Sequence, residues 1–216
     1  MALLGIKDAP EAFWEALEGR YRAYTGWAQE NLTQLSEGEM WRLWMLPDVA
    51  PQQIEAVAEE LALAWSQRKG RALPAPGADE TLAELKHCGY RLGIISNTLS
   101  SLDIPRSLTA DGWDDYFEVV IQSSALRSRK PAPDLFLEAA RLLDVEPARC
   151  AYVGNRISKD IVGCKRAGYQ LGIIIEASGK PHADEADQPV RPDMVIHSFG
   201  ELLNIFSAVR ATQNAF

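Results

Sequence analysis

The sequence predicts an α/β protein, with a doubly wound parallel sheet preceded by a helical domain. Residues 9–69 show helical periodicity throughout. A Pro- and Gly-rich hinge follows at residues 71–78, and after it short apolar runs alternate with amphipathic segments. Such alternation is typical of a parallel sheet covered on both faces by helices. We therefore expect a helical domain over residues 1–71 and an α/β core over residues 72–216.

The composition is that of a soluble globular protein. Hydrophobic residues make up 47% and charged residues 24% of the 216 residues. The net charge of −8 disfavours nucleic acid as a partner, because phosphates would be repelled. No apolar run approaches the ~18 residues that a membrane span needs. Three cysteines without metal-like spacing indicate reduced, buried thiols in a cytoplasmic protein: Cys88, Cys150 and Cys164.

The first half of the chain carries the start and stop signals of several helices. Ser36 and Glu39 form a capping-box pattern before an apolar run. Pro51 and Gly70 bound a further predicted helix, since proline suits the first turn and glycine the end. Five of the six tryptophans lie in this half, either as packing core or as a wall facing a substrate; they are Trp14, Trp27, Trp41, Trp44 and Trp65.

The second half predicts five strands with helices between them. Expected strands cover residues 91–95, 118–121, 150–154, 171–175 and 193–197. Expected helices cover residues 79–88, with Gly89 as the stop, then 133–144, 158–167 and the segment "GELLNIFSAV". Ligands of such sheets bind beyond the carboxyl ends of the strands, so the residues after each strand are the site candidates.

Polar residues follow the first two strands. Ser96, Asn97 and Thr98 offer a hydroxyl and successive backbone N–H groups, which suit a phosphoryl oxygen, although serine and asparagine are also common turn formers. Lys130 precedes Pro131 at a predicted helix start, where the helix dipole does not favour a cation. Lys130 therefore either has an anionic partner or is an ordinary surface lysine.

Asn155 and Asp160 follow the strand "CAYVG". Their oxygens are of the type that Mg²⁺ prefers, but Asp160 could instead cap the next helix. Basic residues cluster around this loop and around Lys130, which suits an anionic ligand or surface salt bridges; they are Arg127, Arg129, Arg156, Lys159, Lys165 and Arg166.

Three of these segments, in this order, resemble the haloacid dehalogenase superfamily, whose members are mostly Mg²⁺-dependent phosphatases. "RLGIISNT" is similar to the second family motif, in which Ser96 would bind the phosphoryl group. "SRKPAPDLF" is similar to the third, with Lys130 neutralising nucleophile and phosphate. "YVGNRISKDIVGCKRAGY" is similar to the fourth, with Asn155 and Asp160 at the metal positions. Residues 1–71 take the place of the family's helical cap, and the resemblance runs from about residue 72 to about residue 205.

The first family motif, a strand ending in Asp-x-Asp with the nucleophile, does not precede residue 72. Asp8 is a poor substitute, because Pro10 stands two residues later, where the motif has its second aspartate. In the family the absent strand lies centrally, between the strands that end at Ser96 and Asn155, so two sheet edges should be left unpaired. "ALLGI" at residues 2–6 is short for that place. We expect an upstream segment to supply the strand, with a divergent chain or a second molecule, as in a homodimer, as alternatives.

The resemblance implies a phosphatase that acts on a small phosphorylated metabolite through an aspartyl-phosphate. Ser96 and Lys130 are the expected catalytic residues, and Mg²⁺ the expected cofactor at a site that Asn155 weakens. The expected substrate contacts are Ser96, Asn97, Thr98, Lys130 and Arg156. Without the nucleophile we expect residues 1–216 to be inactive. The alternatives are a silent phospho-ligand or partner-binding protein, a dehalogenase, and a nucleotide-binding domain, which the absence of Gly-x-Gly-x-x-Gly disfavours.

Overall fold

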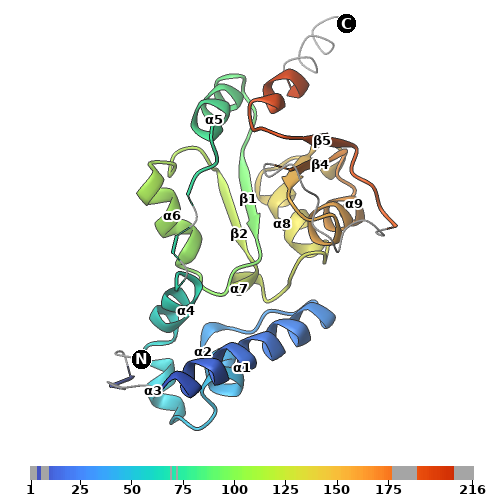
Figure 1. Cartoon of the computed structure of the whole chain (residues 1–216). Coiled ribbons are helices and arrows are strands. Elements are labelled where there is room, and N and C mark those ends of the chain that lie inside the picture. Colours follow the sequence, from blue (N-terminus) through green and yellow to red (C-terminus); the bar gives the residue numbers. More distant parts are fainter. Residues whose placement is uncertain (1–3, 6–9, 69, 72, 177–188, 207–216) are drawn as a thin grey trace, which may run out of the picture. The chain divides into compact units, whose positions relative to one another are not determined.

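Helices dominate the first part of the structure, and strands alternate with helices in the rest (Figure 1). The computed structural model describes residues 4–5, 10–68, 70–71, 73–176 and 189–206. The chain divides into two units. The helical unit comprises Met1–Arg71, Ser96–Thr109 and Gln122–Arg129, and the α/β unit comprises Ala72–Ile95, Ala110–Ile121 and Lys130–Phe216.

Over its described residues before the hinge, the helical unit contains, in order, α1 (Glu11–Glu30), α2 (Glu37–Met40), η2 (Trp41–Met45), α3 (Pro51–Glu55) and α4 (Ala58–Ser66). The capping box is confirmed, because the Glu39 amide donates to the Ser36 hydroxyl and the Ser36 amide donates to the Glu39 carboxylate. The single helix expected from Pro51 is wrong. Val57 leaves the helical conformation, with φ −139°, so the helix is interrupted between α3 and α4.

Tryptophans of the helical unit serve mainly in packing. Trp41 and Trp65 are buried and meet edge to face, with ring centroids 6.1 Å apart. Trp27 and Trp44 are partly buried against the same cluster, which also contains Leu99 from a later segment of this unit. Trp14 differs, because 44% of it is exposed. The later segments of the unit contribute α7 (Ser123–Leu126) and most of α6 (Asp103–Asp111).

The α/β unit confirms each predicted strand, and the predicted helices at residues 79–88, 133–144 and 158–167, to within two residues at either end. The predicted helix "GELLNIFSAV" is helical over residues 201–206, and its last three residues, 207–209, lie outside the described residues. Its strands are β1 (Gly93–Ser96), β2 (Val119–Gln122), β3 (Ala151–Gly154), β4 (Leu171–Ile175) and β5 (Met194–Ile196). Its helices are α5 (Ala78–His87), α8 (Asp134–Leu142), the short η3 (Pro147–Arg149), the π-helix η4 (Ile157–Ile161), α9 (Val162–Arg166) and a helical stretch at residues 201–206. Gly89 ends α5 in the left-handed conformation, as expected.

Two layers of apolar side chains cover the sheet that β3, β4 and β5 form. On one side Phe136 of α8 packs edge to face against Tyr152 and Tyr169, and Cys164 of α9 joins this cluster. A separate cluster places Leu202, from residues 201–206, against Ile173 and Ile196 of the sheet. The predicted doubly wound α/β fold is therefore confirmed. Within the described ranges, no helix combines the length and apolar character that crossing a bilayer requires.

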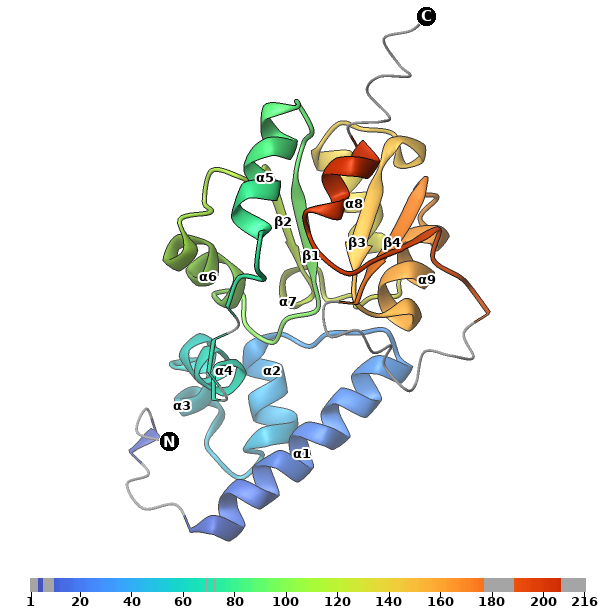
Figure 2. The same ribbon diagram turned by 45° about the horizontal axis from the view of Figure 1, so that its top comes forward.

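The strands of the α/β unit form two sheets. β1 and β2 form one, and β3, β4 and β5 form a parallel sheet in that order. Figure 2 shows β3 on the side of β1 that faces away from β2. In the part of the chain that the structure describes, no strand pairs with both β1 and β3. Over the described residues, β1 and β3 therefore each keep one unpaired edge, as the sequence led us to expect.

Candidate functional site

Lys130 lies just before α8 and is almost fully buried, with 9% of its surface exposed. Its ammonium group donates to the Asp160 carboxylate at 2.6 Å, to the Tyr152 hydroxyl at 2.8 Å and to the Ile95 carbonyl at 3.1 Å. All these groups belong to the α/β unit. An ammonium group has three hydrogens to donate, so these acceptors can hold it in one position. The interpretation of Lys130 as a surface lysine is excluded.

Asp160 lies in the π-helix η4 and is 3% exposed. One carboxylate oxygen accepts from Lys130, and the other accepts from the backbone amides of Asn155 and Arg156, both at 3.0 Å. The carboxylate thus closes the loop that follows β3 and also holds the ammonium group. Asp160 is not an N-cap, because it lies inside η4. Single π-turns of this kind are frequent at functional sites.

Gly154 makes this close arrangement possible. A Cβ atom at Gly154 would lie 2.5 Å from the Asp160 side chain, which is closer than real Cβ contacts come. The glycine that ends the "CAYVG" strand is therefore required by the approach of Asp160 and its ion pair.

Tyr152 connects the two sheets. Its ring projects from β3, and its hydroxyl donates to the Ile95 carbonyl of β1 at 2.9 Å while it accepts from Lys130. Burial, together with the nearby Asp160 carboxylate, raises the pKa of Tyr152 well above its usual value, so the hydroxyl keeps its hydrogen. Side chains of Tyr152 and Lys130 thus bridge the unpaired edges of β1 and β3.

Sequence reasoning did not single out Tyr152 or the Ile95 carbonyl. Tyr152 lies within an apolar strand, where an aromatic residue usually serves only in packing. Its polar hydroxyl was the available signal, because a buried tyrosine hydroxyl usually has a hydrogen-bond partner. A backbone carbonyl carries no sequence signal.

Among the predicted site residues, Lys130 and Asp160 meet directly. Asn155 and Arg156 join them through their backbone amides, while the Asn155 residue itself is exposed. Ser96 follows Ile95 in the chain. The substrate contacts of these side chains stay predictions.

Ser96, Asn97 and Thr98 belong to the helical unit. Thr98 is buried there, and its amide and carbonyl both bond to the Ser123 hydroxyl. Its own hydroxyl lies 3.1 Å from that of Ser124. These bonds show a structural role for Thr98 and occupy its backbone groups; its predicted contact with a substrate stays a prediction.

The expected magnesium site needs several oxygen ligands in octahedral geometry. Asp160 and Asn155 supply one carboxylate and one amide, and the carboxylate is already paired with Lys130. Over the described residues, no group of three His, Cys, Asp or Glu side chains comes together. The residues present do not fit a complete magnesium site, so no reaction step is derived through the metal.

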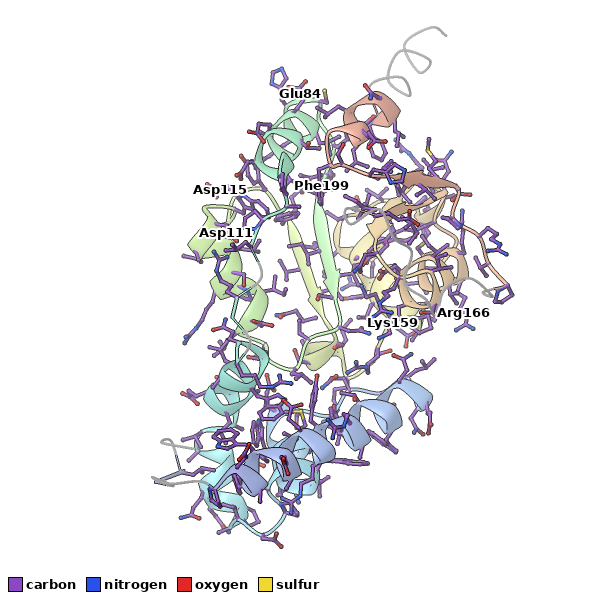
Figure 3. The ribbon with its side chains drawn as sticks, viewed as in Figure 1. Glu84, Asp111, Asp115, Lys159, Arg166 and Phe199 are labelled. Carbon is purple, nitrogen blue, oxygen red and sulfur yellow. The ribbon has the colours of Figure 1, made fainter. Side chains whose placement is uncertain are left out.

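The predicted basic clusters divide into different settings. Lys165 pairs with Asp193, as a surface salt bridge would, and Arg127 pairs with Glu39 in the helical unit. Figure 3 labels Lys159 and Arg166, which lie on the η4 and α9 side of the α/β unit. For Lys165 and Arg127 the salt-bridge interpretation is confirmed.

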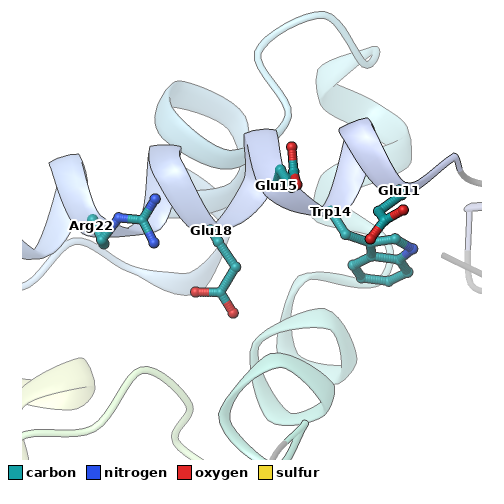
Figure 4. Close-up of a pocket in the computed structure, with 5 residues that line it drawn as sticks. All are labelled: Glu11, Trp14, Glu15, Glu18 and Arg22. Carbon is teal, nitrogen blue, oxygen red and sulfur yellow. The ribbon is translucent and has the colours of Figure 1, made fainter.

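A hollow on the surface of the helical unit is a poor site for phosphate. One side of α1 lines it with Glu11, Trp14, Glu15, Glu18 and Arg22 (Figure 4). Three carboxylates would repel an anionic ligand. One of them, Glu18, is already paired with Arg68 at 3.0 Å. The buried cluster around Lys130 is therefore the stronger candidate.

The three cysteines are free thiols, as expected. Cys164 is buried, and burial raises its pKa to about 11, which makes it a poor nucleophile. Cys88 and Cys150 are only partly buried, so the expectation of burial is wrong for these two. His87 and His197 are exposed, and His182 lies outside the described residues.

Comparisons with known proteins show which family and which fold the chain resembles. The family model described as haloacid dehalogenase-like hydrolase matches residues 15–174. The phosphoglycolate phosphatase of Nitrosococcus oceani is 35% identical over 147 residues, which cover 68% of this chain and 63% of that protein. The chain thus spans less than two thirds of the length of the curated relatives that it matches first.

Solved structures show the same fold. The HAD phosphatase from Thermococcus onnurineus matches with a TM-score of 0.56 and 27% identity, covering 77% of this chain and 68% of that one. The 2-haloacid dehalogenase from Pseudomonas syringae pv. Tomato matches with a TM-score of 0.67 and 24% identity, covering 96% of this chain and 84% of that one.

Proposed function

Because the chain belongs to the haloacid dehalogenase-like hydrolase family, we propose that it carries the anion-binding part of a phosphatase site for a small phosphorylated metabolite. One observation carries this proposal: Lys130 is a buried cation that a carboxylate and two neutral oxygens hold in place. Phosphatases among the relatives, including one named for phosphoglycolate, support the substrate class.

The surroundings of Lys130 allow a phosphoryl oxygen to enter. Asp160 fixes the ammonium group through a charge-assisted bond, which is stronger than a bond between neutral groups. Tyr152 and Ile95 offer neutral acceptors, so an anionic oxygen competes well for the hydrogens that they receive. Lys130 would then stabilise the charge that develops on phosphorus-bound oxygens during transfer.

A complete reaction also needs a nucleophile and a general acid. In the family, one aspartate attacks phosphorus, a second protonates the leaving alcohol, and water then hydrolyses the phospho-aspartyl intermediate. Residues 1–216 contain no Asp-x-Asp before residue 72. This chain is therefore proposed to bind phosphate and not to turn over phosphomonoesters, until a carboxylate nucleophile is supplied between β1 and β3.

Phosphate binding is tested by thermal unfolding with and without inorganic phosphate. We expect phosphate to raise the melting temperature of the natural chain by more than that of Lys130→Met. Arg166→Met removes an exposed cation from the same unit and should keep the response. Circular dichroism of each variant checks that it is folded. If phosphate stabilises Lys130→Met as much as the natural chain, the site is not at Lys130.

Turnover is tested with p-nitrophenyl phosphate and Mg²⁺. We expect no release of nitrophenol by this chain. Appreciable Mg²⁺-dependent turnover that Asp160→Ala abolishes would show that a nucleophile is already in place and would contradict the proposed inactivity.

A second candidate is a catalytically silent protein that binds a phosphorylated ligand. Asn155 favours this second candidate. The family motif has an acid at that position, and the amide removes one negative charge from the metal site. The DNA upstream of the Met1 codon discriminates the candidates. An in-frame strand that ends in Asp-x-Asp supports the phosphatase, and its absence supports the silent binding protein.

A further inference from the structure

The helical unit contains a second buried cation. Arg129 is 8% exposed, and its guanidinium donates to the side-chain oxygen of Gln34. No carboxylate pairs with it among the residues that the structure describes. A charged group that leaves water without a counter-charge is costly, and burial accordingly lowers the pKa of Arg129. Such a group therefore needs an explanation.

The backbone fixes where Arg129 lies. Its amide donates to the Leu32 carbonyl at 3.0 Å, and the Gln34 amide donates to the Arg127 carbonyl at 3.2 Å. Thr33 and Ser128 form an antiparallel bridge between these two contacts. All of these residues belong to the helical unit. The short paired segment keeps the guanidinium beside Gln34, so its burial is built into the unit.

One edge of the guanidinium has no partner. Nη1 is used by Gln34, whereas Nε is buried and has no hydrogen-bond partner in the described part of the chain. Nη2 also makes no hydrogen bond to a described residue. The Nε and Nη2 hydrogens of an arginine point the same way, and together they match the two oxygens of a carboxylate or phosphate.

The neighbouring side chains add a further donor. Guanidinium can only donate, so Gln34 turns its oxygen to Arg129 and its amide nitrogen to the Tyr24 hydroxyl, at 2.7 Å. The Tyr24 oxygen accepts a second bond from the Leu35 amide at 3.2 Å. Over the described residues, the Tyr24 hydrogen has no acceptor. The row from Arg129 through Gln34 to Tyr24 therefore has more donors than acceptors.

We infer that Arg129, Gln34 and Tyr24 form a binding site for a small oxyanion, a carboxylate or a phosphate, within the helical unit. The anion takes the unpartnered Nε and Nη2 edge of Arg129 and supplies the missing counter-charge. This site is separate from the one proposed at Lys130 and does not depend on the phosphatase proposal.

The site is tested by NMR of the Arg129 Nε–H group in the ¹⁵N-labelled chain. The resonance is assigned by its loss in Arg129→Lys. We expect it to shift downfield and to saturate as sodium glycolate or inorganic phosphate is added. A response to glycolate alone identifies a carboxylate site, one to phosphate alone a phosphate site, and one to both a general oxyanion site.

Two controls keep the result specific. Sodium chloride at matched ionic strength should not shift the resonance, and Arg127→Met, which removes a neighbouring arginine already paired with Glu39, should leave the response intact. The titration is repeated in Lys130→Met, where the Arg129 response should persist and the phosphate-induced rise in melting temperature should be smaller than in the natural chain but still present if the Arg129 site takes phosphate. If neither anion shifts the resonance, or chloride shifts it equally, the inference is overturned.

Discussion

Arg129 and Lys130 are consecutive residues with the same charge and almost the same burial, yet their surroundings are opposite. Lys130 belongs to the α/β unit and meets the Asp160 carboxylate, which two backbone amides also hold. Arg129 belongs to the helical unit and meets only the neutral oxygen of Gln34 among described partners. One cation is neutralised by a carboxylate of the protein, and the other has no carboxylate partner among the described residues.

This difference shows what a buried charge implies. A buried ion pair contributes little net stability, but breaking it leaves a lone charge at high cost. Lys130 and Asp160 should therefore behave as a unit that tolerates joint replacement better than single replacement. A buried cation without a carboxylate should instead respond to added anions.

The largest effect is expected for Asp160→Ala. The substitution leaves Lys130 without its counter-charge and removes the acceptor of the Asn155 and Arg156 amides. The free energy of unfolding, measured by urea denaturation, should fall by about 3–5 kcal/mol. The double variant Lys130→Met/Asp160→Leu should recover the part of this loss that the unpaired ammonium group causes, while the two amides still lack their acceptor.

Glu138→Ala is the matched control. It breaks an exposed ion pair with Arg141 in the same unit and should leave the unfolding free energy almost unchanged. Equal losses in Asp160→Ala and Glu138→Ala, or a double variant as unstable as Asp160→Ala, would show that Lys130 and Asp160 are not coupled.

A smaller effect is expected for Gly154→Ala. The added methyl group would lie 2.5 Å from Asp160 and must push it away from Lys130. Overpacking of this kind costs roughly 1–3 kcal/mol in urea denaturation. Gly200→Ala serves as control, because a methyl group there meets no described atom within 4 Å. A neutral Gly154→Ala would mean that the Asp160 loop adjusts freely and does not hold Lys130 tightly.

The sequence predicted the α/β elements well and the contrast between the two cations poorly. Strands such as "LGIII" and the capping box of Ser36 and Glu39 depend on neighbours in the chain, so local pattern was sufficient. Lys130 and Asp160 were singled out as site residues because three motifs occur in order, but their pairing with each other was not predicted. By pattern alone, Arg127 and Arg129 are equivalent members of one basic cluster. Only tertiary contacts pair Arg127 with Glu39 and bury Arg129 against Gln34.

The interruption at Val57 was missed for a related reason. The segment from Pro51 to Trp65 keeps good helix formers throughout, and nothing in it matches the usual glycine or proline stop. Ile54 and Leu61, on either side of the interruption, are both buried in the core of the helical unit. Packing against that core can override local helix propensity, because the propensity of each residue contributes little free energy.

The smallest effect is expected for Glu39→Gln, a substitution that tests whether Arg129 lacks a counter-charge. Glu39 accepts from the Ser36 amide and pairs with Arg127, and these contacts lower its pKa below the ordinary 4.5. A carboxylate whose pKa is lowered by folding stabilises the fold at pH values above its unfolded-state pKa. This contribution disappears as the pH falls through the folded-state pKa. Glutamine still completes the capping box, so the loss in unfolding free energy near pH 7 should be only about 0.5 kcal/mol. The difference between the natural chain and the variant should vanish well below pH 4.5, as followed by urea denaturation across pH. A loss of several kcal/mol at pH 7 would make Glu39 the missing partner of Arg129, and the two buried cations would then be alike.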